Sequence, residues 1–134
     1  GLLSMDEDAS ERDLKILKNI NALLKKDSKF LLTTLNGLRM IRMYNDNDIK
    51  EGRFVPLTIA VIHPLTELIK DAPSNILIRE KGFTAIELMH MFMASGFSVE
   101  HIWGGTAGSW ERKPLKMDEI EVMVLGRKIK DVEY

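Results

Sequence analysis

The chain has 134 residues, of which 45% are hydrophobic, and this predicts one domain with its own core. Its formal net charge of −1 provides no overall field that would attract nucleic acid or an anionic membrane surface. The absence of cysteine excludes disulfides, thiolate zinc sites and cysteine nucleophiles, and with only three histidines we expect no metal site.

Nothing in the sequence indicates a targeting or membrane segment. There is no basic leader followed by a long apolar run, and no uninterrupted apolar stretch of about 18 residues. Together with the lack of cysteine, this predicts a soluble, cytoplasmic protein. The chain opens on Gly1 rather than on methionine, from which we expect a trimmed start or a piece of a longer chain.

An amphipathic helix is predicted over residues 11–26. Apolar side chains recur at helical spacing from Leu14 to Leu24, and Ser10 with Asp13 three residues later has the form of a capping box. The apolar face of this helix should pack on a sheet.

The following run, residues 29–37, organises the rest of the chain. It is apolar and β-branched, it follows a helix, and it closes on the turn pair Asn36-Gly37, which predicts a buried strand of a parallel sheet. Ligands of open α/β sheets lie just beyond the carboxyl ends of such strands. Asn36, Gly37 and the segment 38–44 are therefore the first candidate site.

Residues 38–80 carry mixed signals and predict an irregular lobe of extended segments. Residues 53–63 are rich in β-branched residues around Pro56 and end at Pro64, and proline confines such a strand to an edge or a bulge. A short helix over residues 65–70 and a short strand over residues 75–79 complete this lobe.

A second helix is predicted to begin at Thr84. Thr84 and Glu87 have capping-box spacing, Phe83 can staple onto Leu88, and Gly96 tolerates a left-handed C-terminal cap. This methionine-rich helix is apolar on nearly every side, so one face should pack on the sheet while the other finds a second cover.

Two strands close the chain. The first covers residues 97–103, with four side chains expected on one face: Phe97, Val99, His101 and Trp103. A glycine-rich loop over residues 104–108 then leads to a buried strand over residues 119–127.

Taken in order, these motifs resemble the C-terminal half of class I S-adenosylmethionine (SAM)-dependent methyltransferases. The resemblance rests on residues 24–36, on Gly82-Phe83-Thr84 with Glu87-Leu88, on residues 94–97 and on the closing strand, residues 121–128. It implies a partial Rossmann-like α/β sheet, with parallel strands, a C-terminal antiparallel hairpin and helices packed on it. It also implies a single domain, residues 1–134, with a substrate-side insertion at about residues 38–80.

The same resemblance implies SAM as the cofactor of the intact fold. Residues 1–4 resemble the loop after the fourth strand of that fold, which makes Leu3 and Ser4 candidate cofactor-binding residues. Two departures stand against tight binding by this chain alone. Residues 26–28 replace the usual Pro-Gly-Gly, and no Gly-x-Gly-x-Gly occurs anywhere. We therefore expect the chain by itself to be inactive.

Candidate site residues each have a plainer alternative. His63, before Pro64, is the candidate catalytic base, or else a solvated loop histidine; His90 and His101 are expected to be structural. Arginines and an aromatic ring after the first strand could bind an anionic or aromatic acceptor, or could simply be surface residues. The candidate substrate-binding residues are Asn36, Gly37, Arg39, Arg42, Tyr44, Trp103 and Trp110.

Three functions are compatible with these patterns. The first is the substrate-side part of a methyltransferase acting on an unidentified, small-molecule acceptor. The second is a non-catalytic module that associates with itself, because a strand that has lost its neighbour exposes an edge. For either, we expect a homo-oligomer through that edge or through the methionine-rich helix. The third, RNA binding through arginines and tryptophans, is disfavoured by the balanced charge.

Overall fold

The computed structural model describes residues 9–133. It contains four α-helices, one 3₁₀-helix and seven strands within that range. In chain order these are α1 (Ala9–Leu23), β1 (Lys29–Asn36), α2 (Gly37–Met43), α3 (Asp46–Lys50), β2 (Phe54–Val55), β3 (Ala60–Pro64), the 3₁₀-helix η1 (Leu65–Glu67), β4 (Leu77–Phe83), α4 (Ala85–Ala94), β5 (Phe97–Thr106), β6 (Ser109–Lys113) and β7 (Glu121–Lys128).

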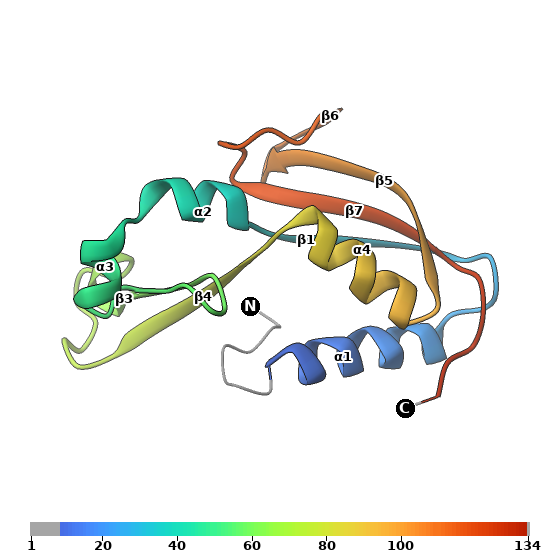
Figure 1. The fold of residues 1–134 in the computed structure, drawn as a ribbon, viewed down its shortest axis with the longest axis horizontal. Helices are drawn as coiled ribbons and strands as arrows, with labels where there is room; N and C mark the ends of the chain where they lie inside the picture. Colours follow the sequence, from blue (N-terminus) through green and yellow to red (C-terminus); the bar gives the residue numbers. More distant parts are fainter. Residues whose placement is uncertain (1–8, 134) are drawn as a thin grey trace.

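The strands form one sheet in the order β2-β3-β4-β1-β7-β5-β6 (Figure 1). β1 is parallel to β4, and all other neighbours are antiparallel. The predicted fold class is confirmed: this is a mixed α/β sheet with a parallel pair and an antiparallel C-terminal part. β1 makes less parallel pairing than expected. It pairs with β4 only through Leu35 and Asn36, whereas residues 29–35 pair with the antiparallel strand β7.

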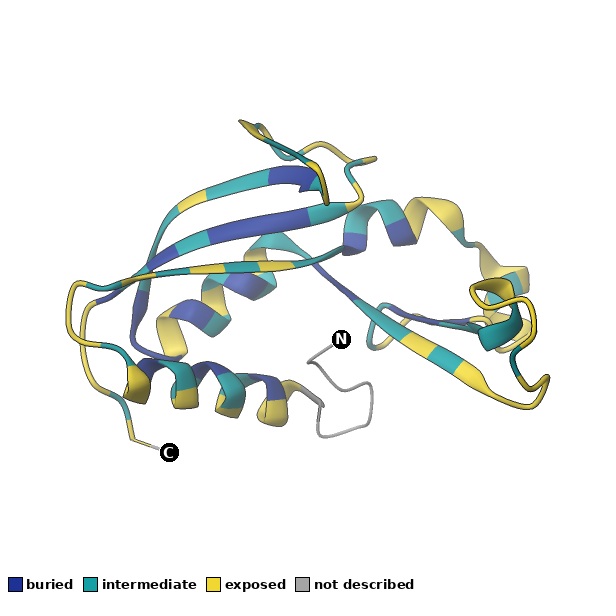
Figure 2. Ribbon diagram, turned by 180° about the vertical axis from the view of Figure 1, so that it is seen from behind, coloured by how far each residue is buried: buried dark blue, intermediate teal, exposed yellow. Residues whose placement is uncertain are grey.

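The main core lies between the sheet and the two long helices. α1 and α4 lie on the same side of the sheet (Figure 1), and the buried residues run along β7 and the inner side of α4 (Figure 2). Phe92 of α4 stacks on Phe30 of β1 at 5.6 Å between ring centroids. The fully or nearly fully buried members of this core are Leu17, Phe83, Leu88, Phe92, Phe97, Val122 and Val124.

A second, smaller core holds the lobe after β1. Met40 of α2 packs with Phe54 and Val61, and Tyr44 stacks on Phe54 at 5.4 Å. The expected lobe of extended segments is wrong in part. β2, β3 and β4 are there, but α2 and α3 are helices that the sequence pattern did not predict. Each begins on an asparagine N-cap: Asn36 accepts from the N–H of Leu38 in α2, and Asn45 forms a capping box in α3.

The two predicted helices form, with different details at their starts. Ser10 lies inside α1 and is therefore not its N-cap, which corrects the predicted capping box. Thr84 does cap α4, since its hydroxyl accepts from the N–H of Glu87 at 3.3 Å. The Glu87 carboxylate contacts Lys81 at 3.2 Å instead of completing that box. Gly96 follows α4 with a φ of 86°, which confirms the predicted left-handed cap.

The predicted faces of β5 are wrong because of a β-bulge. The register with β7 shifts between Val99 and His101. Val99 and Ile102 therefore pack against the main core, whereas His101 stacks on Trp103 away from it, at 5.0 Å between ring centroids.

The predicted glycine loop is also corrected. Gly104 and Gly105 continue β5, and the chain turns back tightly between Thr106 and Ser109, with Gly108 at a φ of 85°. Within residues 9–133, no helix is long and apolar enough to cross a membrane.

The α3 capping box provides a pH-dependent test. Asp48 accepts from the N–H of Asn45 and from Nε of Arg53, both at 2.9 Å, and these bonds lower the pKa of its carboxyl group. A lowered folded-state pKa contributes stability above the ordinary carboxyl pKa of about 4 and loses it as the pH falls through the folded value.

We expect Asp48→Asn to lower the melting temperature at pH 7, and this difference from wild type to shrink in melts at pH 3. The same change at exposed Asp71 should alter the free energy of unfolding by less than about 0.5 kcal/mol at either pH. A deficit in the Asp48 variant that stays constant with pH would contradict this.

Candidate functional site at the carboxyl end of β1

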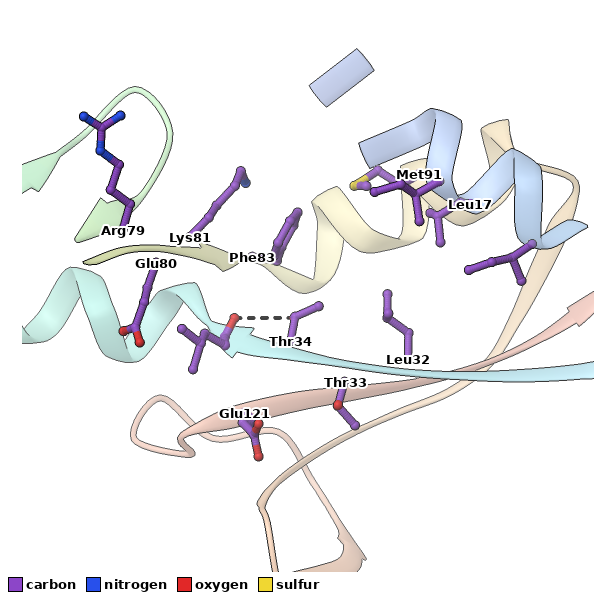
Figure 3. Close-up of a pocket in the computed structure, with 13 residues that line it drawn as sticks. Leu17, Leu32, Thr33, Thr34, Arg79, Glu80, Lys81, Phe83, Met91 and Glu121 are labelled. Carbon is purple, nitrogen blue, oxygen red and sulfur yellow. Dashed lines mark hydrogen bonds between the residues drawn. The ribbon is translucent and has the colours of Figure 1, made fainter. Parts of the chain in front are cut away.

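An apolar groove of about 320 Å³ lies beside β1. We call it the β1 groove. Its walls are residues 32–35 of β1 and residues 79–81 of β4, with Ile16, Leu17 and Ile20 of α1 and Met91 of α4 around it. Figure 3 shows Leu32 and Phe83 pointing to the side where Leu17 and Met91 lie, so the groove is apolar where it meets the helices.

The backbone of β1 is open along this groove. The N–H of Lys128 donates to the carbonyl of Ser28, and the N–H of Asn36 donates to the carbonyl of Ile120. Because hydrogen bonding alternates along an antiparallel ladder, the even-numbered residues of β1 bond to β7. The N–H and C=O groups of Lys29, Leu31 and Thr33 therefore point to the other edge. Within residues 9–133, no strand pairs with that edge before Leu35.

A second cavity, of about 260 Å³, lies at the carboxyl end of β1. We call it the carboxyl-end pocket. It combines an apolar surface with ionisable groups from α2, β3, η1 and β4. Its lining residues are Leu35, Arg39, Met40, Met43, Tyr44, Val61, His63, Glu67, Glu80 and Ile120. The sequence predicted a ligand site here, and three of the candidate residues, Arg39, Tyr44 and His63, line the pocket together.

His63 lies between two carboxylates that were not predicted from the sequence. Its Nδ1 is 3.2 Å from Oε2 of Glu67, and its Nε2 is 3.6 Å from Oε2 of Glu80. The imidazole is only 16% exposed, and its buried Nδ1 has no hydrogen-bond partner among the described residues. Nδ1 of His63 is therefore a hydrogen-bonding atom without a partner at the wall of the carboxyl-end pocket.

Tyr44 presents a fixed aromatic wall. Its ring is nearly parallel to that of Phe54, with an interplanar angle of 7°. Burial raises the pKa of the Tyr44 hydroxyl, and nearby carboxylates, among them Glu67 and Glu80, raise it further. The hydroxyl is therefore a neutral hydrogen-bond donor at physiological pH.

The other candidates after β1 are occupied by contacts within the chain. Asn36 is fully buried, and its amide nitrogen donates to the carbonyls of Lys116, Met117 and Glu119 at 2.9 to 3.3 Å. Gly37 is buried, and a Cβ there would lie 3.1 Å from the backbone of Phe83. Neither residue lines the carboxyl-end pocket.

The arginines of α2 reach toward the loop before β7. Arg42 forms an ion pair with Asp118 at 2.9 Å, and Arg39 donates to the carbonyl oxygen of Asp118 at 3.2 Å. Arg39 lines the pocket and Arg42 does not. The two arginines were predicted to lie in one binding site. Only Arg39 does so, whereas Arg42 contacts the loop before β7.

The two tryptophans lie on the β5–β6 hairpin and line neither cavity. Trp103 is stacked on His101 and has the Arg112 guanidinium 5.7 Å from its ring centroid. Trp110 packs on Gly105 so closely that a Cβ there would lie 2.6 Å from the indole. Leu3 and Ser4 lie outside the described residues. Among residues 9–133, no cluster of three or more side chains could hold a metal ion.

The fold of this chain is similar to part of the fold of two solved methyltransferase structures. One is a SAM-dependent methyltransferase from Methanosarcina mazei, with a TM-score of 0.60 and 12% identity over 90% of this chain and 52% of that one. The other is the CcbJ methyltransferase from Streptomyces caelestis, with a TM-score of 0.57 and 12% identity over 89% and 54%.

At this identity the likeness concerns the fold alone. The chain spans about half the length of the solved structures it matches. No family model matches the sequence, and no curated protein matches it either.

Proposed function

We propose that this chain is the C-terminal, substrate-side part of a SAM-dependent methyltransferase, and that the carboxyl-end pocket receives a small-molecule methyl acceptor. The observation that supports this most is the open edge of β1 over an apolar groove. Unpaired strand edges beside apolar surface are features that complete domains avoid. The matched structures are also about twice as long as the part this chain covers.

The described residues of this chain do not fit SAM as a resident cofactor. In Rossmann-like sheets the nucleotide lies against a glycine-rich turn between a parallel strand and a helix. The glycines with positive φ are Gly52, Gly96 and Gly108, which follow α3, follow α4 and close the β5–β6 hairpin. We therefore assign cofactor binding to the remainder of the fold and derive no step through SAM from this chain.

The contribution of this chain would be orientation. Methyl transfer requires the acceptor atom to approach in line, so the walls that hold the acceptor and exclude water account for much of the rate. The carboxyl-end pocket has such walls, because the Tyr44 ring and the apolar side chains would hold the apolar part of the acceptor. His63 would be available to hold a proton.

Calorimetric titration with SAM tests the proposal. We expect no binding by these 134 residues, and binding at micromolar concentration by a longer polypeptide that includes the sequence encoded directly before Gly1. Binding by the short chain would contradict the assignment of the cofactor to the rest of the fold. Failure of the longer polypeptide to bind SAM would contradict the methyltransferase function itself.

A non-catalytic module that associates with itself is the second candidate. Its support is exposed apolar surface: Ile86 and Met93 on α4 are 63% and 65% exposed, and Leu31 on the far face of β1 is 53% exposed. We propose a homo-oligomer through the β1 edge or through α4.

Sedimentation of the wild type at micromolar concentration should give a dimer or larger species, and a monomer would refute self-association. Met93→Glu should produce monomers if α4 is the interface, and leave the dimer intact if the β1 edge is. Ile41→Glu, at an exposed position of α2, is the matched control.

A further inference from the structure

The charges of the carboxyl-end pocket favour a cation over an anion. Two carboxylates, Glu67 and Glu80, line it against one guanidinium, Arg39. Arg39 already donates to a backbone carbonyl, and Arg42, which could have added positive charge, is paired with Asp118. The pocket therefore has more unsatisfied negative than positive charge among the described residues.

Strand alternation strengthens this imbalance at Glu80. Its neighbours Arg79 and Lys81 are cations, but successive side chains of a strand point to opposite faces. Figure 3 shows Arg79 and Lys81 on one side of β4 and Glu80 on the other. Lys81 is also paired with Glu87 at 3.2 Å. Glu80 thus faces the carboxyl-end pocket without its flanking cations.

The imidazole of His63 makes no well-formed hydrogen bond to either carboxylate. The Nε2 to Glu80 distance of 3.6 Å is beyond a hydrogen bond, and the 3.2 Å contact of Nδ1 with Glu67 is poorly directed. At least one carboxylate therefore retains its acceptor capacity for a ligand that brings several N–H donors.

The remaining wall suits an apolar body. Met40, Met43 and Val61 line the pocket, and the Tyr44 ring is held in place by Phe54. An aromatic face of this kind packs well against an apolar or aromatic group. A ligand with a charged amine at one end and an apolar group at the other would match both halves of this surface.

We propose that the carboxyl-end pocket binds a small primary or secondary amine in its protonated form, with the ammonium group between Glu67 and Glu80 and the apolar body against Tyr44. This rests on the proposed function only in making the amine the class of methyl acceptor, for which the bound ammonium would first give a proton to a pocket base such as His63 so that its nitrogen has a free lone pair. The binding itself can be tested on the chain alone.

The test compares three probes with one phenyl body: phenethylamine, 2-phenylethanol and phenylacetate. The chain has three histidines, and only His63 lines the pocket, while His90 and His101 are exposed on α4 and β5. In a proton–carbon NMR titration at pH 7, we expect phenethylamine to shift the imidazole signals of His63 and to leave those of His90 and His101 in place. The alcohol and the acid should bind at least about tenfold more weakly, since a hydrogen bond to a charged group is lost.

Charge-neutralising variants identify the carboxylates. Glu80→Gln and Glu67→Gln should each weaken phenethylamine binding about tenfold or more, whereas Glu111→Gln on exposed β6 should not change it. Equal binding of amine and acid, or an unchanged affinity in both pocket variants, would overturn the proposal. Amine binding by a chain whose extended form does not bind SAM would uphold this site and reject the methyltransferase function.

Discussion

Asn36→Asp is expected to destabilise the protein by about 4 kcal/mol, although it changes one atom of one side chain. The Asn36 amide nitrogen donates to three carbonyl oxygens of the loop before β7, and the residue is 0% exposed. A carboxylate there would place a buried negative charge against three acceptors. Urea unfolding followed by circular dichroism at pH 7 measures the effect.

The control is the same substitution at an exposed cap. Asn45 begins α3 and accepts from the backbone N–H groups of Asn47 and Asp48, a role that aspartate fills equally well. Asn45→Asp should therefore change the free energy of unfolding by less than about 1 kcal/mol. Equal unfolding midpoints for the two variants would show that the buried amide does not hold the loop.

Asn36 also illustrates how much of the fold is predictable from the sequence. Its position at the carboxyl end of a strand was predicted from the apolar run and its turn pair, but β1 alternates exposed and half-buried side chains and is not the buried strand expected. The helix predicted over residues 11–26 is observed as Ala9–Leu23, and the predicted helix that stops at Gly96 is observed as Ala85–Ala94. These features depend on local periodicity and caps. What Asn36 contacts is set by residues 116–119, some eighty positions later, and no local pattern contains that information.

The lobe was predicted less well for a related reason. α2 and α3 are only 7 and 5 residues long, too short for an apolar period to be recognised. Each begins on an asparagine cap, and α2 also packs through Met40 into the small core. The bulge in β5 likewise depends on its pairing with β7. A single unpaired residue there reversed the faces assigned to His101 and Trp103.

The candidate site was predicted in part. Arg39 and Tyr44 were chosen because they follow β1. His63 was chosen as a loop histidine, whereas it lies on β3. The fold does bring all three to one cavity. Glu67 and Glu80 were missed, because isolated glutamates in a charged sequence are usually solvated. The spacing of Glu67 four residues after His63 was the one available signal. Glu80 reaches the pocket only through the pairing of β3 with β4.

A buried lysine that was not singled out from the sequence is expected to have the other large effect. Lys128 of β7 is 4% exposed, and its ammonium group donates to the carbonyls of Asn21 and Leu24 at 2.7 Å each. It also pairs with Asp131 at 2.8 Å. α1 has no basic residue in its own last turn, so Lys128 provides the positive charge and the donors that this helix end requires.

Lys128→Met keeps most of the apolar stem but removes every one of these donors, so we expect a loss of about 3 kcal/mol in urea unfolding. Lys130→Met, two residues later and exposed, should cost less than about 0.5 kcal/mol. Hydrogen exchange tells whether Lys128 holds α1 in particular or stabilises the whole fold. If Lys128 holds α1, the backbone amides of α1 should exchange faster in Lys128→Met than the amides of α4, which packs on the same core.

Uniform loss of protection in both helices would mean instead that the apolar contacts of Leu17 hold α1 and that Lys128 acts on the whole fold. The distinction matters for the β1 groove, because Ile16, Leu17 and Ile20 of α1 form its apolar wall. A helix fastened only at its C-terminal end by Lys128 can adjust its other end to a strand entering along the open edge of β1. A helix held along its whole length by the core presents a groove of fixed width.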